Sequence, residues 1–334
     1  MSQPMSQSQV KLKADPLPNV LFRYRPPESV DDCAEIEAGL SKSPKSLNPK
    51  YFYDTLGSEL FEQITQQPEY YPTRTERKIL TDYAEEIAEH LGKSCVLIEP
   101  GSGSSEKVRL LLDALRPRCY VPIDIAAEFL HQSVVKLGAE FPWLDIRAIC
   151  ADFAHASTLL GDLPKGRKVV FYPGSTLGNM VPSQAQTFLS KIRMSLGEDG
   201  AVLLGLDLHK DSDTLNAAYN DSQGVTRAFN MNALTHVNRI LGANFEPSHF
   251  EHRAFYNEQM NRIEMHLVSQ LDHIVRLGKK AIAFSEGETI HTENSYKYRL
   301  EQLDSLLKST GLVREKSWVD EKQLFSVSYL KCVV

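Results

Sequence analysis

The most informative absences in this sequence are of long apolar runs, paired cysteines and excess positive charge. None of its 334 residues lie in an apolar stretch of membrane-spanning length, and the polar N-terminus lacks a signal-peptide core. The formal charge of −6 gives no reason to expect a nucleic-acid partner. The five cysteines form no Cys-x-x-Cys pair, as is usual for reduced thiols. We therefore expect a cytoplasmic monomer with neither a nucleic-acid nor a membrane partner.

The chain does contain a glycine-rich turn at the start of an alternating pattern of strands and helices. An apolar run at 96–98 predicts a buried strand, and a helical pattern starts near Ser104. Between them, Gly101 and Gly103 allow close approach of a ligand to the backbone, while the helix start offers unpaired N–H groups. The third glycine of the dinucleotide fingerprint is missing. Glu99-x-Gly-x-Gly looks more like the first loop of S-adenosylmethionine-dependent methyltransferases, although an ordinary strand-to-helix turn has the same pattern.

The alternation after this turn predicts a doubly wound parallel sheet. The expected strands are 96–98, 119–123, 146–150, 168–172 and 201–206, with helices at 126–138 and 183–196. Ligands bind beyond the carboxyl ends of such strands. The polar residues expected there are Asp124, Asp152, Asn179 and Asp207. A helix at 298–311 and strands at 312–319 and 324–332 then close the sheet in the manner of a methyltransferase, with an antiparallel last strand.

The remaining segments predict a second domain. Residues 209–290 interrupt the alternation with helices at 212–219 and 224–241 and strands at 253–256 and 262–271. Tyr70 and Tyr71, which precede Pro72, predict an extended segment, and Thr73 or Thr75 could cap a helix from Glu76 to about Leu91. The expected division is a disordered tail (1–15), a substrate-binding domain (16–75 and 209–297) and a cofactor-binding domain (76–208 and 298–334).

Several motifs, in the right order from about residue 18 onward, resemble the L-histidine Nα-methyltransferases of ergothioneine biosynthesis. They include Phe52-Tyr-Asp54, Pro68-Glu-Tyr-Tyr-Pro-Thr-Arg-Thr-Glu76, Gly101-Ser-Gly103, Gly174-Ser-Thr-x-Gly-Asn179 and Thr292-Glu-x-Ser295. The resemblance implies an α/β fold, with a Rossmann-like seven-stranded class I methyltransferase sheet and an inserted α+β substrate-binding domain. It implies up to three methyl transfers from S-adenosyl-L-methionine to the α-amino group of L-histidine, giving trimethylhistidine (hercynine). Pro100 departs from the family's usual leucine, and we expect it to stay away from the chemistry.

The same resemblance implies a cofactor pocket lined by Gly101, Ser102, Lys107, Asp124, Asp152 and Phe153. Asp124 follows Gly101 at about the spacing at which an acid accepts bonds from ribose hydroxyls. Asp152 would accept from the adenine amino group, Phe153 would pack on the ring, and Lys107 would reach the cofactor's carboxylate. Taken alone, Lys107 could equally be a solvated helix residue, and Asp124 a helix cap.

The implied substrate site combines tyrosines, an asparagine and a late acid–hydroxyl pair. The α-amino and carboxylate ends would be held by Tyr53, Tyr70, Gly174, Asn179 and Tyr219, with Tyr53 and Asn179 as the catalytic candidates. Glu293 and Ser295 share one face of an extended segment, so they can accept from and donate to the two nitrogens of an imidazole. Met265 would pack beside the ring. Individually, each of these side chains could be purely structural.

The chemistry implied is displacement by a neutral amine, with catalysis mainly by positioning. No strong base is evident, so the proton is expected to leave to solvent or with help from a tyrosine or Asn179. His249-x-x-His252 is interpreted as surface chemistry, and no metal is expected. Two alternatives stay open. One is a related enzyme acting on another amino acid, such as tryptophan or tyrosine, and the other is a binding protein that has lost activity.

Overall fold

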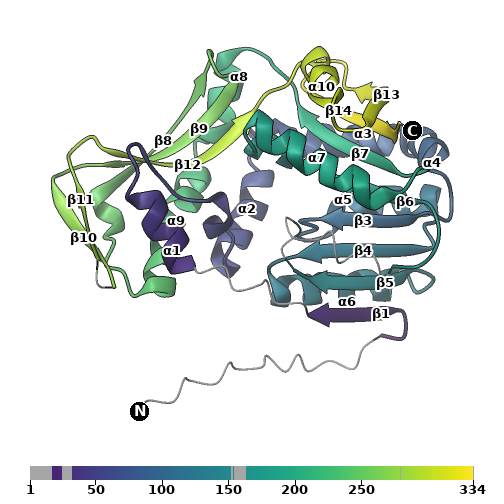
Figure 1. The fold of residues 1–334 in the computed structure, drawn as a ribbon, viewed down its shortest axis with the longest axis horizontal. Helices are drawn as coiled ribbons and strands as arrows, with labels where there is room; N and C mark the ends of the chain where they lie inside the picture. Colours follow the sequence, from purple (N-terminus) through teal and green to yellow (C-terminus); the bar gives the residue numbers. More distant parts are fainter. Residues whose placement is uncertain (1–16, 25–31, 152, 154–162, 279, 334) are drawn as a thin grey trace.

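The computed structural model describes residues 17–24, 32–151, 153, 163–278 and 280–333. Within them, a large sheet flanked by helices lies beside a smaller sheet with its own helices (Figure 1). In this part of the chain, no helix has the length and apolar character needed to cross a bilayer. The expected disordered tail, residues 1–15, lies outside the described ranges.

The large sheet confirms the doubly wound pattern. Its strand order is β1-β5-β4-β3-β6-β7-β14-β13, and β1 to β7 in this sheet pair in parallel. The last strand, β14, runs antiparallel to both neighbours, as expected for closure of the sheet. The bounds are β1 (Val20–Tyr24), β3 (Val96–Pro100), β4 (Cys119–Asp124), β5 (Asp145–Cys150), β6 (Lys168–Tyr172), β7 (Ala201–Asp207), β13 (Leu312–Val319) and β14 (Phe325–Cys332).

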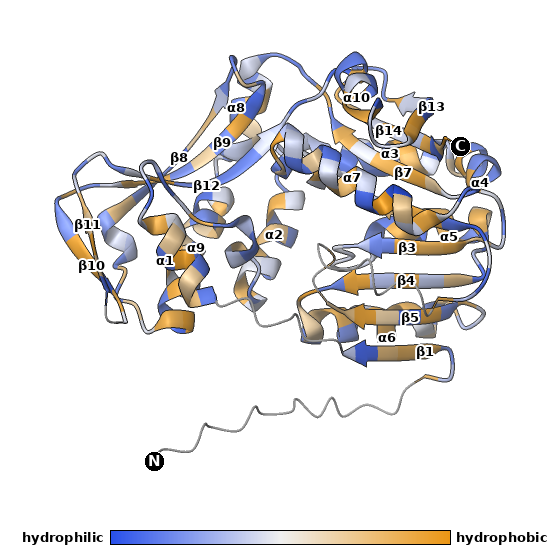
Figure 2. Ribbon diagram, in the orientation of Figure 1, coloured by the Kyte–Doolittle hydropathy of each residue, from blue (hydrophilic) through white to orange (hydrophobic). Residues whose placement is uncertain are grey.

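Helices bury both faces of this sheet, which explains why its strands are continuous apolar runs. On one face Leu97 packs with apolar residues of α3 to α6, and on the other Val96 and Ile98 pack with α7 and α10. Figure 2 shows the apolar colour concentrated along these strands. The helices are α3 (Tyr71–Asp82), α4 (Ala84–Leu91), α5 (Glu106–Leu115), α6 (Ala127–Glu140), α7 (Pro182–Leu196) and α10 (Leu300–Leu307).

The predicted assignment of residues 20–24 to the substrate-binding domain is wrong. Residues Val20 to Tyr24 pair in parallel with Ile146 to Cys150 of β5, so they add an eighth strand to the seven expected. Asn19 anchors the strand, since its amide nitrogen donates to the carbonyls of Gly138 and Leu144, both at 3.1 Å. The start of the chain therefore covers the edge of the large sheet, where an unpaired strand would otherwise be exposed.

The helix expected over residues 76–91 is wrong in its start and its continuity. It begins at Tyr71, because a proline in the first turn removes only an N–H that has no helical partner, and Pro72 stands there. Neither threonine caps it, and the Thr75 hydroxyl instead donates to the Tyr71 carbonyl at 2.9 Å. The helix ends at Asp82, and α4 starts after Tyr83, whose φ of −113° and ψ of 17° leave helical values.

The second region is a four-stranded sheet in the order β2-β12-β9-β8, with four helices and a hairpin of β10 and β11. Its strand β12 is an inner strand between β2 and β9, and shortly after it Tyr298 forms a parallel bridge with Leu208, just beyond β7 of the large sheet (Figure 1). The two sheets are thus joined by the segment that carries Glu293. The bounds are α1 (Asp32–Leu40), β2 (Lys45–Ser46), α2 (Thr55–Thr65), α8 (Ser212–Tyr219), α9 (Val225–Leu241), β8 (Phe250–Asn257), β9 (Arg262–Ser269), β10 (His273–Leu277), β11 (Lys280–Phe284) and β12 (Thr289–Tyr296).

Candidate active site

A cavity of about 480 Å³ lies where the carboxyl ends of the large sheet's strands meet the second region. Its volume is in the range of small-molecule sites. Of the predicted site residues that the structure describes, its wall includes all except Ser295. Those in the wall are Tyr53, Tyr70, Gly101, Ser102, Lys107, Asp124, Phe153, Gly174, Asn179, Tyr219, Met265 and Glu293. Residues far apart in the sequence therefore meet in one cavity.

The glycine turn after β3 forms one end of this cavity. Gly101 and Gly103 have φ values of 65° and 51°, a region that favours glycine, and an added Cβ would meet no atom within 4 Å at either residue. The Asp124 carboxylate accepts from the backbone N–H groups of Gly103 at 3.0 Å and Ala126 at 2.9 Å. Lone pairs remain on both oxygens for ribose hydroxyls. The Ser102 hydroxyl is buried without a partner among the described residues, so this end fits S-adenosylmethionine.

A buried acid on α3 that the sequence reasoning missed links two parts of the cavity wall, the helix after the glycine turn and the loop after β6. Glu76 is fully buried, and its Oε2 lies 2.6 Å from Lys107 Nζ. Its two oxygens also accept from the Gly174 N–H, at 2.9 and 3.0 Å. Lys107 is therefore an ion-paired residue of the cavity wall rather than a solvated one. The sequence feature that could have identified Glu76 is its position as the last residue of the Pro68–Glu76 motif.

Glu293 lies on β12 among the tyrosines of the opposite end. It is 9% exposed, and burial raises the pKa of its carboxyl to about 7, an effect that the positive charge of Lys297 opposes. Burial, with Glu293 nearby, also holds the pKa values of Tyr53, Tyr70 and Tyr219 well above the usual value for a phenol. These tyrosines stay protonated near neutral pH, which favours roles as hydrogen-bonding groups over roles as bases.

Asp152 lies outside the described residues, so its predicted contact with adenine is not described. Ser295 is absent from the cavity wall and lies behind Tyr219, whose hydroxyl donates to it at 2.8 Å. Pro100, which we expected to stay away from the chemistry, does line the cavity, because the glycine turn brings the end of β3 into the wall.

Asn179 ends a short 3₁₀ helix, η3 (Thr176–Asn179), that packs against β12. A Cβ added to Gly178 would lie 2.9 Å from the Tyr296 carbonyl oxygen, so only glycine fits there without a shift. This contact brings the loop after β6 against the strand that carries Glu293.

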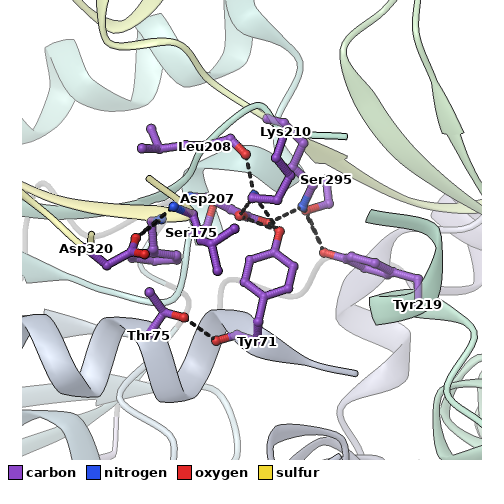
Figure 3. A network of polar contacts seen from close by, with 12 residues as sticks. Tyr71, Thr75, Ser175, Asp207, Leu208, Lys210, Tyr219, Ser295 and Asp320 are labelled. Atoms are coloured by element: carbon purple, nitrogen blue, oxygen red, sulfur yellow. Dashed lines mark hydrogen bonds and ion pairs between the residues drawn. The ribbon is translucent and has the colours of Figure 1, made fainter. Parts of the chain in front are cut away.

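A polar junction around Asp207, at the end of β7, joins groups from α3 and from the segments after β7 and β12 (Figure 3). The Tyr71 hydroxyl donates to both oxygens of Asp207, at 2.7 and 2.8 Å. Lys210 Nζ donates to Asp207 Oδ1 and to the Tyr71 hydroxyl, both at 2.6 Å. Asp207 was expected only as a residue at a strand end, and the structure shows it 1% exposed and ion-paired.

The interpretation of His249 and His252 as surface chemistry is wrong for His252. Its Nε2 donates to the Tyr219 carbonyl at 3.1 Å, and its Nδ1 accepts from Asn230 at 2.9 Å, so it supports the helix end that carries Tyr219. Another group with metal-ligand chemistry, formed by Glu264, His266 and His291, has one ligand atom from each residue within 4.8 Å of the others. Arg262 already pairs with that glutamate at 2.7 Å.

Comparison with known proteins matches residues 32–332 to the family described as "Histidine-specific methyltransferase, SAM-dependent". The chain is 43% identical to histidine N-alpha-methyltransferase of Mycolicibacterium smegmatis, over 88% of this chain and 92% of that protein. It is 30% identical to ergothioneine biosynthesis protein 1 of Neurospora crassa, over 82% of this chain and 32% of that longer protein. It is 27% identical to 4-dimethylallyltryptophan N-methyltransferase of Claviceps purpurea, over 86% of this chain and 91% of that protein.

Proposed function

Because this chain belongs to the family of histidine-specific, S-adenosylmethionine-dependent methyltransferases, we propose that it methylates the α-amino group of L-histidine. The transfer occurs up to three times and yields trimethylhistidine (hercynine) for ergothioneine biosynthesis. The observation that carries this proposal is the single cavity lined by both the glycine turn and Glu293. Such a cavity can hold a methyl donor at one end and an amino acid at the other.

The cofactor end consists of Gly101, Ser102, Lys107, Asp124 and Phe153, with Asp152 expected beside them. S-adenosylmethionine supplies an activated methyl group on a sulfonium. In this proposal, Asp124 accepts from ribose hydroxyls, and Phe153 packs on the adenine. Lys107, already oriented by Glu76 at 2.6 Å, faces the cofactor's carboxylate.

In this proposal, the substrate end binds histidine both at its imidazole ring and at its α-amino and carboxylate groups. Glu293 accepts from the imidazole N–H, and Met265, its neighbour across the β9–β12 pair, packs beside the ring. Tyr53, Tyr70, Tyr219, Gly174 and Asn179 hold the α-amino and carboxylate groups. A site built to pair with a ring N–H rejects amino acids that lack one, since its buried carboxylate would be left unpaired.

Catalysis in this site rests on positioning. The amine must be neutral to attack, and alignment of the reacting groups in one cavity supplies much of the rate. Tyr53 and Asn179 are the groups that we propose to orient the amine. The raised pKa of Tyr53 keeps its phenol neutral, so its oxygen accepts from an amine N–H and leaves the lone pair free to attack, while the proton leaves to solvent.

The decisive experiment is mass spectrometry of histidine incubated with the protein and S-adenosylmethionine. We expect species with one, two and three added methyl groups. A parallel panel with tryptophan, tyrosine and 4-dimethylallyltryptophan tests the alternative substrates, which the similarity to the Claviceps protein brings in. Methylation of a panel member in preference to histidine would replace the proposed substrate. Calorimetric binding of the cofactor without turnover of any amino acid would support the binding-protein alternative.

We also propose that residues 209–297, together with residues 32–70 between β1 and α3, form the substrate-binding domain, and that the protein acts as a cytoplasmic monomer. The four buried cysteines are free thiols, which supports a reducing compartment. Light scattering of the purified protein would test the monomer, with a dimer mass as the contrary outcome.

A further inference from the structure

Directly after β12, the structure buries a lysine that neither the motifs nor the proposed function uses. The side chain of Lys297 is 0% exposed. Its Nζ lies 2.8 Å from Asp207 Oδ2, 2.8 Å from Ser295 Oγ and 3.2 Å from the Tyr219 hydroxyl. A buried ammonium is costly unless it is paired, and these contacts use all three of its donors.

Neutralising Asp207 does not by itself require Lys297. Lys210 Nζ already lies 2.6 Å from Asp207 Oδ1, and Tyr71 donates to both carboxylate oxygens. With two ammonium groups around one carboxylate, the junction holds a surplus positive charge. Of the two lysines, Lys297 is the one that also contacts the hydroxyls of Ser295 and Tyr219, beside the proposed substrate end.

The contacts of Lys297 constrain the hydrogens of these two hydroxyls. An ammonium cannot accept a hydrogen bond, so both oxygens accept from Lys297. The single bond between them, 2.8 Å from the Tyr219 oxygen to Ser295 Oγ, uses one of their two hydrogens. Among the described residues, no acceptor takes the other hydrogen. If Tyr219 donates in the shared bond, the hydrogen left over is that of Ser295, which lies behind the wall. If Ser295 donates instead, the Tyr219 hydrogen is left over, and Tyr219 lines the substrate end of the cavity. The pair therefore offers a donor to the cavity in the arrangement in which Ser295 donates to Tyr219.

We propose that Lys297 is a positioning residue that holds the Tyr219–Ser295 pair as a hydrogen-bond donor and so selects a substrate ring bearing an acceptor. This inference rests on the proposed function. A neutral imidazole offers an N–H, which Glu293 accepts, and a lone pair, which the hydroxyl pair meets. A pyrrole or indole ring offers the N–H alone and leaves the donor unpaired.

The test compares histidine with 3-(pyrrol-2-yl)alanine, which keeps a ring N–H but lacks the second nitrogen's lone pair. In Lys297→Met, the two hydroxyl oxygens lose the ammonium donor from which both accept, so they can accept from each other or from the substrate and no longer have to present a donor. We expect kcat/KM for histidine to fall at least tenfold, mainly through KM, with a much smaller change for the pyrrole analogue. The selectivity ratio should therefore fall about tenfold, which corresponds to about 1.4 kcal/mol.

Lys210→Met is the matched control, because it removes the other ammonium from Asp207 but touches neither Ser295 nor Tyr219. Its selectivity ratio should stay within twofold of wild type, even if its melting temperature falls as much as that of Lys297→Met. Equal changes of the ratio in both variants, or an unchanged ratio in Lys297→Met, would overturn the proposal.

Ser295→Ala provides a second route if Lys297→Met folds poorly, since it removes one hydroxyl and keeps the ammonium. It should lower the same ratio at least tenfold, and an unchanged ratio would again overturn the proposal. The wild-type assay separates this outcome from failure of the proposed function. A wild-type protein that does not methylate histidine refutes the function, whereas one that methylates histidine with variant-independent selectivity refutes only the role of Lys297.

Discussion

At the scale of single residues, the candidate site combines groups whose properties depend on burial. Glu293 and the nearby tyrosines are ordinary titrating groups in water, but burial raises their pKa values in the cavity. A carboxylate with no described donor of its own is poised to take one from a ligand. This is the physical basis for expecting Glu293 to decide which side chain binds.

Replacement of this acid should weaken the reaction with histidine specifically. We expect Glu293→Ala to lower kcat/KM for histidine at least tenfold, a loss of about 1.4 kcal/mol or more, because the imidazole N–H loses its acceptor. Steady-state kinetics with saturating cofactor measures this, with the exposed Glu89→Ala on α4 as the control. Unchanged activity would remove the specificity argument.

The raised pKa of Glu293 also predicts how stability depends on pH. Below pH 4.5 the carboxyl is protonated in both the folded and the unfolded state, so burying it costs no ionisation free energy. As the pH rises from 4.5 through about 7, the unfolded state ionises first and the free energy of unfolding falls. Glu293→Gln cannot ionise, so its melting temperature relative to wild type should rise by roughly 2 °C or more between pH 5 and pH 8. Thermal unfolding at both pH values, with Glu89→Gln in parallel, checks this. A difference that is constant with pH would contradict it.

At the scale of elements, the site depends on how short segments pack against one another. The loop after β6 ends in η3, and its glycine fits against the backbone of β12. The same arrangement places Asn179 and Glu293 in one cavity wall. The position of the substrate relative to the cofactor therefore depends on a contact between two backbones.

A side chain at Gly178 should separate these elements. We expect Gly178→Ala to cost about 1–3 kcal/mol of stability, because its Cβ would lie 2.9 Å from the Tyr296 oxygen and one element must shift. KM for histidine should rise while cofactor affinity changes little, since the glycine turn after β3 is untouched. Denaturation and kinetics measure the two effects. Met194→Ala, at a residue 76% exposed on α7, is the control, and wild-type values for Gly178→Ala would show that η3 adapts freely.

At the scale of the whole molecule, the two sheets are joined by charge as well as by chain connections. Asp207 ends β7 of the large sheet, and it pairs with Lys297 just after β12 of the small one. Burial alone would raise the pKa of Asp207, but Lys297 and Lys210 hold it below its usual value. A charged junction of this kind fixes how the cofactor end and the substrate end of the cavity face each other.

Neutralising this aspartate should loosen the whole protein. Asp207→Asn leaves two buried ammonium groups without their counter-ion, and we expect a loss of about 3–5 kcal/mol of unfolding free energy. Chemical denaturation should show this loss, and Asp213→Asn on the exposed side of α8 should not. If the two variants were equally stable, the junction would not hold the sheets together.

Much of this protein could be predicted from its sequence because the signals are local. Apolar runs such as 168–172 and the two-glycine turn carry their own backbone preferences, and the strand that ends at Asp124 is followed by its helix at the usual spacing. The resemblance motifs then identified the residues that line the cavity. Even β9, with Ile263, Met265 and Leu267 on one face, was visible as an alternation.

Only the tertiary structure decided which distant groups meet. The position of β1 is set by its pairing with β5. The contacts of Glu76 are with Lys107 and Gly174, which are distant from it in the sequence. Lys297 stands between two tyrosines in a polar stretch and resembles a surface charge, yet it is fully buried. Local propensity cannot reveal this, because the free energy that keeps an ammonium in the interior comes from Asp207, ninety residues away.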